Sequence, residues 1–188
     1  MRSAGYNQTD PYSGYHLRFP LKTRVPMTGF FILAGIIAYA YLSHYVSYSL
    51  MKTRILKEKH WELNVCCGKT DGGGVNADIF EHKELPNFRL IDDIYNLPFL
   101  NKEFKTVLCS HTIEHVDDPA AFLKELRRIG KDVTVVIPPL YDITAALNIF
   151  EHKWIFLTFK KKHTTLPPHF RLPFSTLAHT MIGQINNA

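Results

Sequence analysis

An apolar segment that ends in a glycine, followed ten residues later by an aspartate, constrains the fold of this chain most strongly. Residues 63–67 (L-N-V-C-C) precede Gly68, and residues 75–79 (V-N-A-D-I) carry Asp78. A parallel α/β sheet places a glycine-rich loop after one strand and a carboxylate at the end of the next. The loop lets the backbone approach a ligand closely, and the carboxylate can bind ribose hydroxyls. The pattern therefore predicts a ligand site at the carboxyl edge of a parallel sheet.

The elements after this pair alternate as in an α/β layer fold. Apolar residues at helical spacing predict a helix at 119–129, with Asp118 as the N-cap and Pro119 in the first position. The run 133–137 is continuous and β-branched, as expected for a strand buried on both faces. We expect strands at 62–67, 75–79, 88–92, 104–109 and 132–137.

The connection between the first two strands is unusually short. Only six residues separate Gly68 from Val75, whereas a parallel crossover normally needs a dozen or more, usually including a helix. Either the first crossover helix is missing, or the second strand lies elsewhere.

Two further blocks complete a family pattern. They are 93–99 (D-I-Y-N-L-P-F) and 110–119 (S-H-T-I-E-H-V-D-D-P). In this order and spacing, the four blocks resemble the small class I S-adenosylmethionine-dependent methyltransferases, over about Trp61 to Pro139. The resemblance implies an abbreviated Rossmann-like parallel-sheet methyltransferase fold and S-adenosyl-L-methionine as the cofactor. The short loop is similar to a subset with the pattern N-L-G-C-G, in which Cys66 takes the place of the first glycine.

The resemblance also implies cofactor-binding residues, while the catalytic residue stays unknown. Gly68 would pass near the methionine portion, next to Cys66, and Asp78 would accept hydrogen bonds from the ribose. Asp93 would recognise the adenine amino group, and His111 would border the methionine end. An ordinary tight turn at Gly68, a solvated Asp78, a hydrogen-bonded turn at His111 and an N-cap or Asx turn at Asp93 remain alternatives.

Three further residues are weaker candidates for binding the methyl acceptor. His115 lies in the same block as His111, and Tyr141 and Asp142 follow the fifth strand at the carboxyl edge. Residues 111–115 also match H-x-x-E-H, an inverted zinc-protease signature. That chemistry needs both histidines on one continuous helix, whereas this motif follows a strand and a new element begins at Pro119. We therefore expect no metal site in this chain.

An uncharged segment precedes the domain. From Thr28 to Leu50 there are 23 residues without Asp, Glu, Lys or Arg, enough for a helix to cross roughly 30 Å of hydrocarbon. A signal peptide, a buried core helix and a surface helix are the alternatives to a transmembrane helix. We expect an extended arm at 1–27, a transmembrane helix at 28–50, a basic connector at 51–60 and the methyltransferase-like domain at 61–188.

Charge and cysteine content suggest the surroundings. The net charge of +5 comes largely from the flanks of the uncharged segment and from residues 160–162, which favours anionic lipid rather than nucleic acid. Four basic residues after the segment against three before it slightly favour a cytoplasmic C-terminal domain. Three cysteines without disulfide or zinc spacing favour a reducing compartment. The expected partners are the lipid bilayer and a protein that would order the arm.

Two functions follow from these observations. The first is S-adenosylmethionine-dependent methyl transfer to a lipid or membrane-associated acceptor. The second is a non-catalytic methyltransferase-like subunit of a membrane or particle assembly. Cys66 at a glycine position, the short first connection and the short segment after Pro139 favour the second function.

Overall fold

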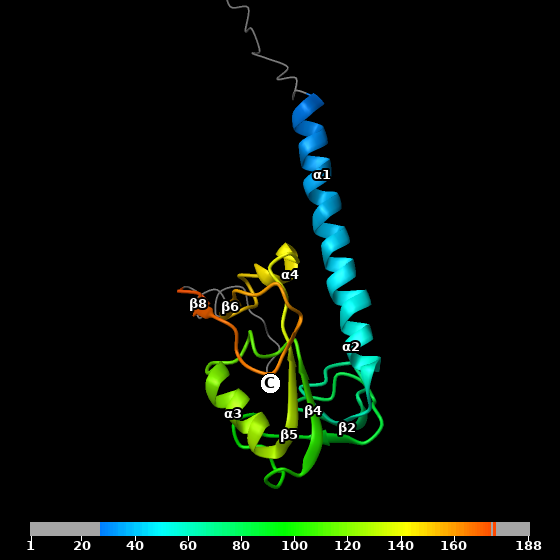
Figure 1. The fold of residues 1–188 in the computed structure, drawn as a ribbon, viewed down its shortest axis with the longest axis vertical. Coiled ribbons are helices and arrows are strands. Elements are labelled where there is room, and N and C mark those ends of the chain that lie inside the picture. Colours follow the sequence, from blue (N-terminus) through cyan, green and yellow to red (C-terminus); the bar gives the residue numbers. More distant parts are fainter. Residues whose placement is uncertain (1–26, 174, 176–188) are drawn as a thin grey trace, which may run out of the picture.

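A six-stranded sheet forms the centre of the domain in the computed structural model, which describes residues 27–173 and 175 (Figure 1). Its strand order is β3-β2-β1-β4-β5-β7, and every neighbouring pair is parallel except β5 with β7. A separate antiparallel pair joins β6 to β8. The predicted mixed α/β fold with a mostly parallel sheet is confirmed. The strands are β1 (Trp61–Val65), β2 (Gly73–Asp78), β3 (Phe88–Leu90), β4 (Phe104–Ser110), β5 (Gly130–Val136), β6 (Trp154–Phe156), β7 (Lys162–His163) and β8 (His169–Arg171).

Helix α3 (Pro119–Ile129) has the predicted bounds and covers one face of the sheet. Asp118 caps it by accepting hydrogen bonds from the backbone N–H groups of Ala120 and Ala121. Its apolar side meets inward-facing residues of β1, β4 and β5 in the main core. The fully buried members of that core include Phe122, Leu126, Ile129, Leu63, Val65, Val107, Cys109 and Val135.

The connection from β1 to β2 contains no helix, which settles the alternative left open by the sequence. The second strand is where it was expected, and β1 and β2 pair in parallel. Two buried amides hold the returning loop against the sheet: the Asn64 side chain donates to the Thr70 carbonyl, and the Asn76 side chain accepts from the Gly72 N–H. The loop therefore covers part of the face opposite α3.

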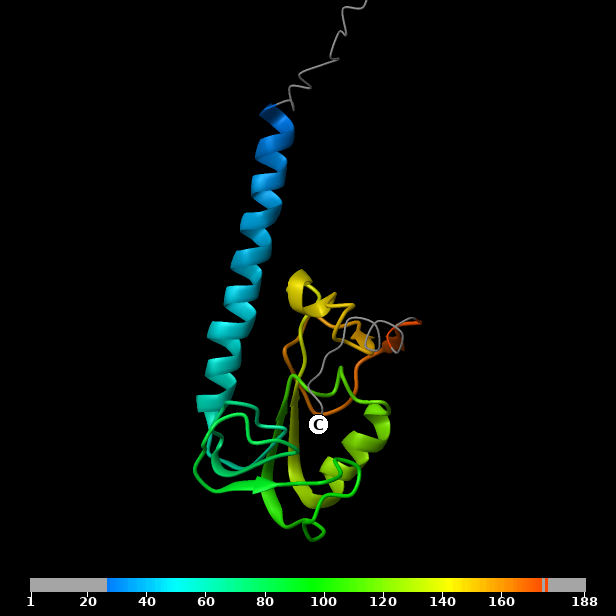
Figure 2. The same cartoon turned by 180° about the vertical axis from the view of Figure 1, so that it is seen from behind.

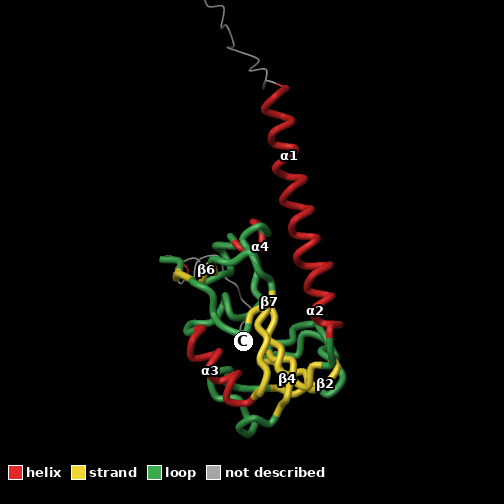
Figure 3. Tube along the Cα trace, in the orientation of Figure 1, coloured by secondary structure: helices red, strands yellow, loops and turns green. Residues whose placement is uncertain are grey.

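One continuous helical rod leads into β1 (Figure 3). It consists of α1 (Met27–His44), the π-helical segment η1 (Tyr45–Met51) and α2 (Lys52–Glu58), so it includes both the predicted span and most of the predicted connector. By length and composition, the rod is long and apolar enough to cross a membrane. The predicted arm, apart from Met27, lies outside the described residues.

The end of this rod covers the rest of the second sheet face. Leu108 and Val136 alternate with the residues that face α3, so they point to the opposite side. There they pack with Ile55 of α2 and with Trp61, whose indole N–H donates to the Leu56 carbonyl. Both faces of the parallel sheet are thus covered, as such a sheet requires.

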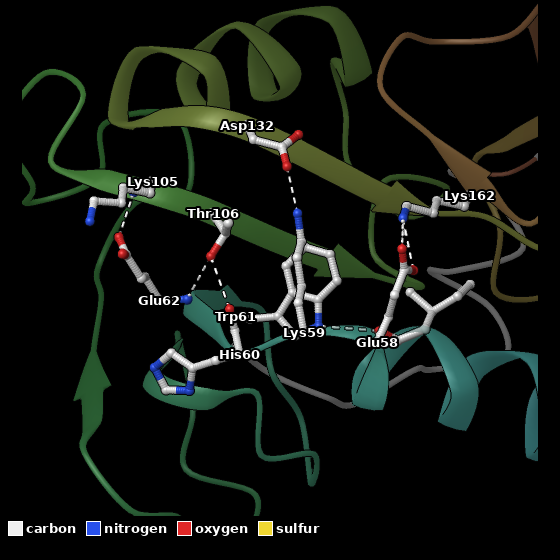
Figure 4. Close-up of polar contacts among 10 residues, drawn as sticks. Glu58, Lys59, His60, Trp61, Glu62, Lys105, Thr106, Asp132 and Lys162 are labelled. Carbon is white, nitrogen blue, oxygen red and sulfur yellow. Dashed lines mark hydrogen bonds and ion pairs between the residues drawn. The ribbon is translucent and has the colours of Figure 1, made fainter.

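Polar contacts fix the junction between the rod and β1 (Figure 4). Lys162 of β7 forms an ion pair with Glu58, and Lys59 forms one with Asp132 of β5. The Thr106 hydroxyl accepts from the Glu62 N–H at 3.0 Å. Exposed pairs contribute little stability individually, so they mainly orient the rod on the sheet.

Farther from β1 along the rod, buried polar groups join α1 and η1 to the domain. The Lys161 ammonium donates to the Ser47 hydroxyl at 2.8 Å, and both side chains are buried. Burial lowers the pKa of Lys161 to about 8. His44 Nδ1 lies 3.2 Å from an Asp142 carboxylate oxygen. The end of the rod near β1 is therefore part of the domain on one side, where Ser43 and Ser47 are buried. Large apolar side chains are exposed along Met27–Leu42, and Tyr45, Tyr48 and Leu50 are exposed beyond it.

A glycine substitution tests the close pairing of β1 with β2. A Cβ at Gly74 would lie 2.5 Å from the carbonyl oxygens of Trp61 and Glu62, and neither backbone group can turn aside. We expect Gly74→Ala to lower the free energy of unfolding by about 1–3 kcal/mol, or to prevent folding. Thermal and denaturant unfolding of the full chain in detergent would measure this. Gly35→Ala, with nothing within 4 Å of the new Cβ, should be neutral or slightly stabilising. Equal losses would contradict the assigned register.

Candidate functional site

A cavity of about 880 Å³ lies at the carboxyl ends of β1, β2 and β4. This volume falls within the range typical of small-molecule sites. The loops after the three strands form most of its wall, and η1 and α2 contribute Tyr48 and Lys52. Its lining includes Cys66, Gly68, Asp78, Ile94, Tyr95, His111, Thr112, His115, Glu151 and Lys153. The edge of the sheet is the one that the sequence predicted.

The loop after β1 is shaped for a close approach by a ligand. Gly68 has φ +54°, and an added Cβ would meet nothing within 4 Å, so the space beside its backbone is open. Asp78 is buried, and its two carboxylate oxygens accept hydrogen bonds from the N–H groups of Gly68 and Ile79, each at 2.8 Å. A carboxylate oxygen can accept more than one hydrogen bond, so Asp78 can still bind a diol.

Cys66 adopts the left-handed conformation, with φ +53°. This conformation costs a residue with a Cβ roughly 1 kcal/mol compared with the right-handed region. Burial raises the pKa of its thiol, so Cys66 remains uncharged and contributes an uncharged wall to the cavity. The loop thus holds a cysteine in a conformation that glycine adopts most readily.

Asp93 lies outside this cavity. Its side chain is exposed and accepts from the Tyr95 N–H at 2.8 Å, which is the Asx turn that the sequence left as an alternative. The turn instead brings Ile94 and Tyr95 into the lining.

His111 occupies a strained position next to a buried carboxylate. It has φ +56°, and its N–H donates to the Val136 carbonyl at 2.9 Å. Its Nδ1 lies 3.4 Å from Oε1 of Glu114, whose side chain is 1% exposed. Burial lowers the pKa of His111 and outweighs the opposing effect of Glu114. Residues 111–115 form a turn, not a helix, so the geometry of the zinc-protease motif is absent there, as predicted.

Glu114 also faces two other histidines, His115 and His152. The rings of this pair meet edge to face with their centroids 4.8 Å apart. Nδ1 of His115 lies 2.9 Å from the Glu151 carbonyl. Burial lowers the pKa of His152 to about 4. Burial alone would raise the pKa of Glu114, but His111, His115 and His152 outweigh it and lower the pKa to about 2.

A second cavity, of about 420 Å³, lies between α1 and α4 (Ile143–Ala146). We call it the groove. The helical rod supplies Ala40, Tyr41, His44 and Tyr48, and the segment around α4 supplies Thr144, Ala145 and Asn148. Figures 1 and 2 show α4 beside the rod in both views. Four residues line both cavities: Tyr48, His111, His115 and Glu151. The groove and the first cavity therefore meet at the histidines.

Tyr141 and Asp142 line neither the first cavity nor the groove. The backbone carbonyl of Tyr141 accepts from the Tyr39 hydroxyl at 3.1 Å. Asp142 caps α4 through the Ala145 N–H and contacts His44. Both residues join the rod to the domain. Sequence reasoning missed Tyr48, Lys52 and His152, because residue spacing gave no sign that these segments would meet.

Comparison with known proteins agrees with the predicted family resemblance. Residues 76–137 match the family model described as a methyltransferase domain. The chain is 29% identical over 129 residues to a demethylmenaquinone methyltransferase from Staphylococcus saprophyticus, with 53% of this chain and 55% of that protein covered. The chain thus spans about half the length of this curated relative.

Solved structures with lower similarity include two bacterial proteins. A SAM-dependent methyltransferase from Thermotoga maritima, described as a possible histamine N-methyltransferase, has 19% identity and a TM-score of 0.42, with 72% of each chain covered. Another from Aquifex aeolicus has 16% identity and a TM-score of 0.37, covering 55% of this chain and 71% of that one.

The domain match implies S-adenosyl-L-methionine as the cofactor, and the first cavity fits it. Gly68 leaves open space at the backbone, and Asp78 offers a buried carboxylate to a ribose diol. Cys66 and His111 border the same cavity. When bound, this cofactor supplies an activated methyl group on a sulfonium.

Two matched substitutions test this assignment. In Asp78→Asn, the amide NH₂ would face one of the two backbone N–H groups that now donate to the carboxylate. We therefore expect the binding of S-adenosylhomocysteine to weaken by about 1.5–3 kcal/mol. Asp93→Asn removes the same charge but keeps the oxygen of the Asx turn, and it should leave affinity nearly unchanged. Isothermal titration of the full chain in detergent would measure both. A comparable loss in Asp93→Asn would restore Asp93 as a ligand.

Proposed function

We propose that this chain transfers a methyl group from S-adenosylmethionine to a membrane-associated acceptor bound in the groove. The observation that carries the proposal is the meeting of the two cavities at His111. A cofactor in the first cavity and an acceptor in the groove would approach each other there. Positioning two reactants in this way provides most of what methyl transfer needs.

His111 is the residue best placed to take a proton from the acceptor. It borders both cavities, and its Nε2 has no hydrogen-bond partner among the described residues. Nδ1 faces Glu114, which can stabilise the imidazolium that forms. The lowered pKa keeps the ring neutral, and so able to accept a proton, at neutral pH. These contacts support His111 as the general base.

The apolar rod supports a membrane location for the acceptor. Large apolar side chains are exposed along Met27–Leu42, as expected for a helix surrounded by lipid. Near the groove, exposed Leu147, Ile149 and Phe150 follow α4, the helix that contacts α1. A lipid-like acceptor could pass from the bilayer along these residues into the groove. The single-pass anchor, with its domain on the cytoplasmic side, is part of this proposal.

The non-catalytic function remains the second candidate because of Cys66. A left-handed cysteine adds strain where glycine would not, as expected if selection for cofactor approach had been relaxed. This candidate predicts the same fold without methyl transfer. An activity measurement therefore separates the two functions.

Blocking the groove tests the acceptor site. Ala145 lines the groove but not the first cavity, so Ala145→Trp should fill the groove and reduce transfer at least tenfold, with S-adenosylhomocysteine affinity unchanged. Ala120→Trp, at an exposed position on α3, is the control. The measurement is transfer of a labelled methyl group from S-adenosylmethionine to the organic extract of membranes incubated with the full chain. Cofactor binding without labelled product would favour the non-catalytic function, and label only in the aqueous phase would exclude a lipid acceptor.

Charge introduced into the exposed rod tests the anchor. Ile32 and Ile36 are more than half exposed, and a lysine at the centre of a bilayer costs about 3 kcal/mol. We expect the wild-type chain to remain in the membrane fraction after a carbonate wash, and the double variant Ile32→Lys, Ile36→Lys to be released. Leu90→Lys, at an exposed position on β3, should behave like wild type. Release of the wild-type chain would exclude a membrane-spanning rod.

A further inference from the structure

Three side chains from two distant segments converge next to the groove. One ligand atom from each of Glu114, His115 and His152 lies within 4.8 Å of the other two. Glu114 and His115 come from the turn after β4, whereas His152 precedes β6. We propose that Glu114, His115 and His152 bind one divalent transition-metal ion, with Zn²⁺ as the ion best suited to two imidazoles and a carboxylate.

The carboxylate is the first reason. Neither oxygen of Glu114 has a hydrogen-bond partner among the described residues, although the side chain is 1% exposed. A buried carboxylate without hydrogen bonds is costly unless a positive charge compensates it. Oε1 lies 3.4 Å from Nδ1 of His111, which leaves Oε2 for another partner. A metal ion between Glu114 and the histidines would supply the missing charge.

The orientation of the imidazoles is the second reason. The backbone carbonyl of Glu151 can only accept, so Nδ1 of His115 is the protonated nitrogen, and Nε2 carries the lone pair. A metal-binding histidine commonly donates its other N–H to a carbonyl in this way. The ring of His152 forms no hydrogen bond among the described residues, where only its backbone N–H donates, to the Asn148 carbonyl, so its ring nitrogens are available to a metal ion.

The backbone holds the two segments together independently of a metal. The carbonyl of Glu114 accepts from the N–H groups of Lys153 and Trp154, at 2.8 and 3.1 Å. The ligand set is therefore positioned by the fold itself. Three protein ligands leave one coordination position open, as in catalytic zinc sites. Because Glu114 and His115 line the groove, an oxygen of the acceptor can reach that position.

This proposal departs from the sequence-based expectation that the chain has no metal site, which was drawn from His111 and His115 alone. His111 and His115 do lie on a single turn, and His111 faces Oε1 of Glu114. The proposed site instead pairs His115 with His152, which spacing within the motif could not reveal. Metal binding by these three residues does not require methyl transfer.

The test uses metal alone, so its outcome is separate from cofactor binding and transfer. Full-length protein in detergent is stripped with a chelator and dialysed against buffered Zn²⁺, and bound metal is measured by plasma mass spectrometry. We expect about one equivalent in the wild-type chain and a raised melting temperature with Zn²⁺. Co²⁺ should give visible absorption bands that Zn²⁺ abolishes. Glu114→Gln, which keeps the side-chain shape, and His152→Asn should each weaken metal binding at least tenfold.

His163→Asn is the matched control, because His163 lies in β7 and contacts Thr158 and Lys160 away from the site. The His163→Asn variant should still bind about one equivalent of Zn²⁺. A folded wild-type chain that binds no Zn²⁺ or Co²⁺ would overturn the proposal, as would full binding in Glu114→Gln. If His152→Asn fails to fold, the measurements on the wild-type chain and on Glu114→Gln still decide whether these residues bind the metal ion.

Discussion

The second face of the parallel sheet must be covered, and most other features of this molecule depend on how that is achieved. A conventional crossover would place a helix there, but the β1–β2 connection is too short to contain one. The returning loop covers β1 and β2, and Ile55 with Trp61 covers Leu108 and Val136. Since Ile55 belongs to the long rod, the apolar helix is fixed to the sheet. Tyr48 lies one helical turn after His44 and next to Ser47, which both contact the domain. It thereby lines both cavities.

The sequence predicted best those features that depend on neighbouring residues. Strand β5 contains the continuous β-branched run from Val133 to Val136, and α3 carries its own N-cap, so both were placed within two residues of their bounds. Gly68 and Asp78 were identified for a similar reason. They are close in sequence, and the parallel pairing of β1 with β2 brings the two strand ends to the same edge, where Gly68 N–H donates to Asp78.

Contacts between distant segments were not predictable from the sequence. Ser47 and Lys161 are 114 residues apart, and nothing in either segment indicates that a buried lysine would meet a serine of an apolar helix. The same applies to Asp142, which a position after β5 suggested as an acceptor contact but which caps α4 and contacts His44. His152 lies beside Glu114 because the Glu114 carbonyl accepts hydrogen bonds from the N–H groups of Lys153 and Trp154, a contact without a sequence signature.

The length of the exposed helix relates the proposed anchor to the proposed acceptor site. Met27–Leu42 spans about 24 Å at 1.5 Å per residue, less than the roughly 30 Å of a hydrocarbon core. Ser43 is already buried against the domain, so a membrane cannot extend farther down the rod on that side. With the proposed anchor, the domain must then lie directly against the bilayer. The apolar side chains of Leu147, Ile149 and Phe150 would enter the interface, and the groove between α1 and α4 would open where the head groups of lipids lie.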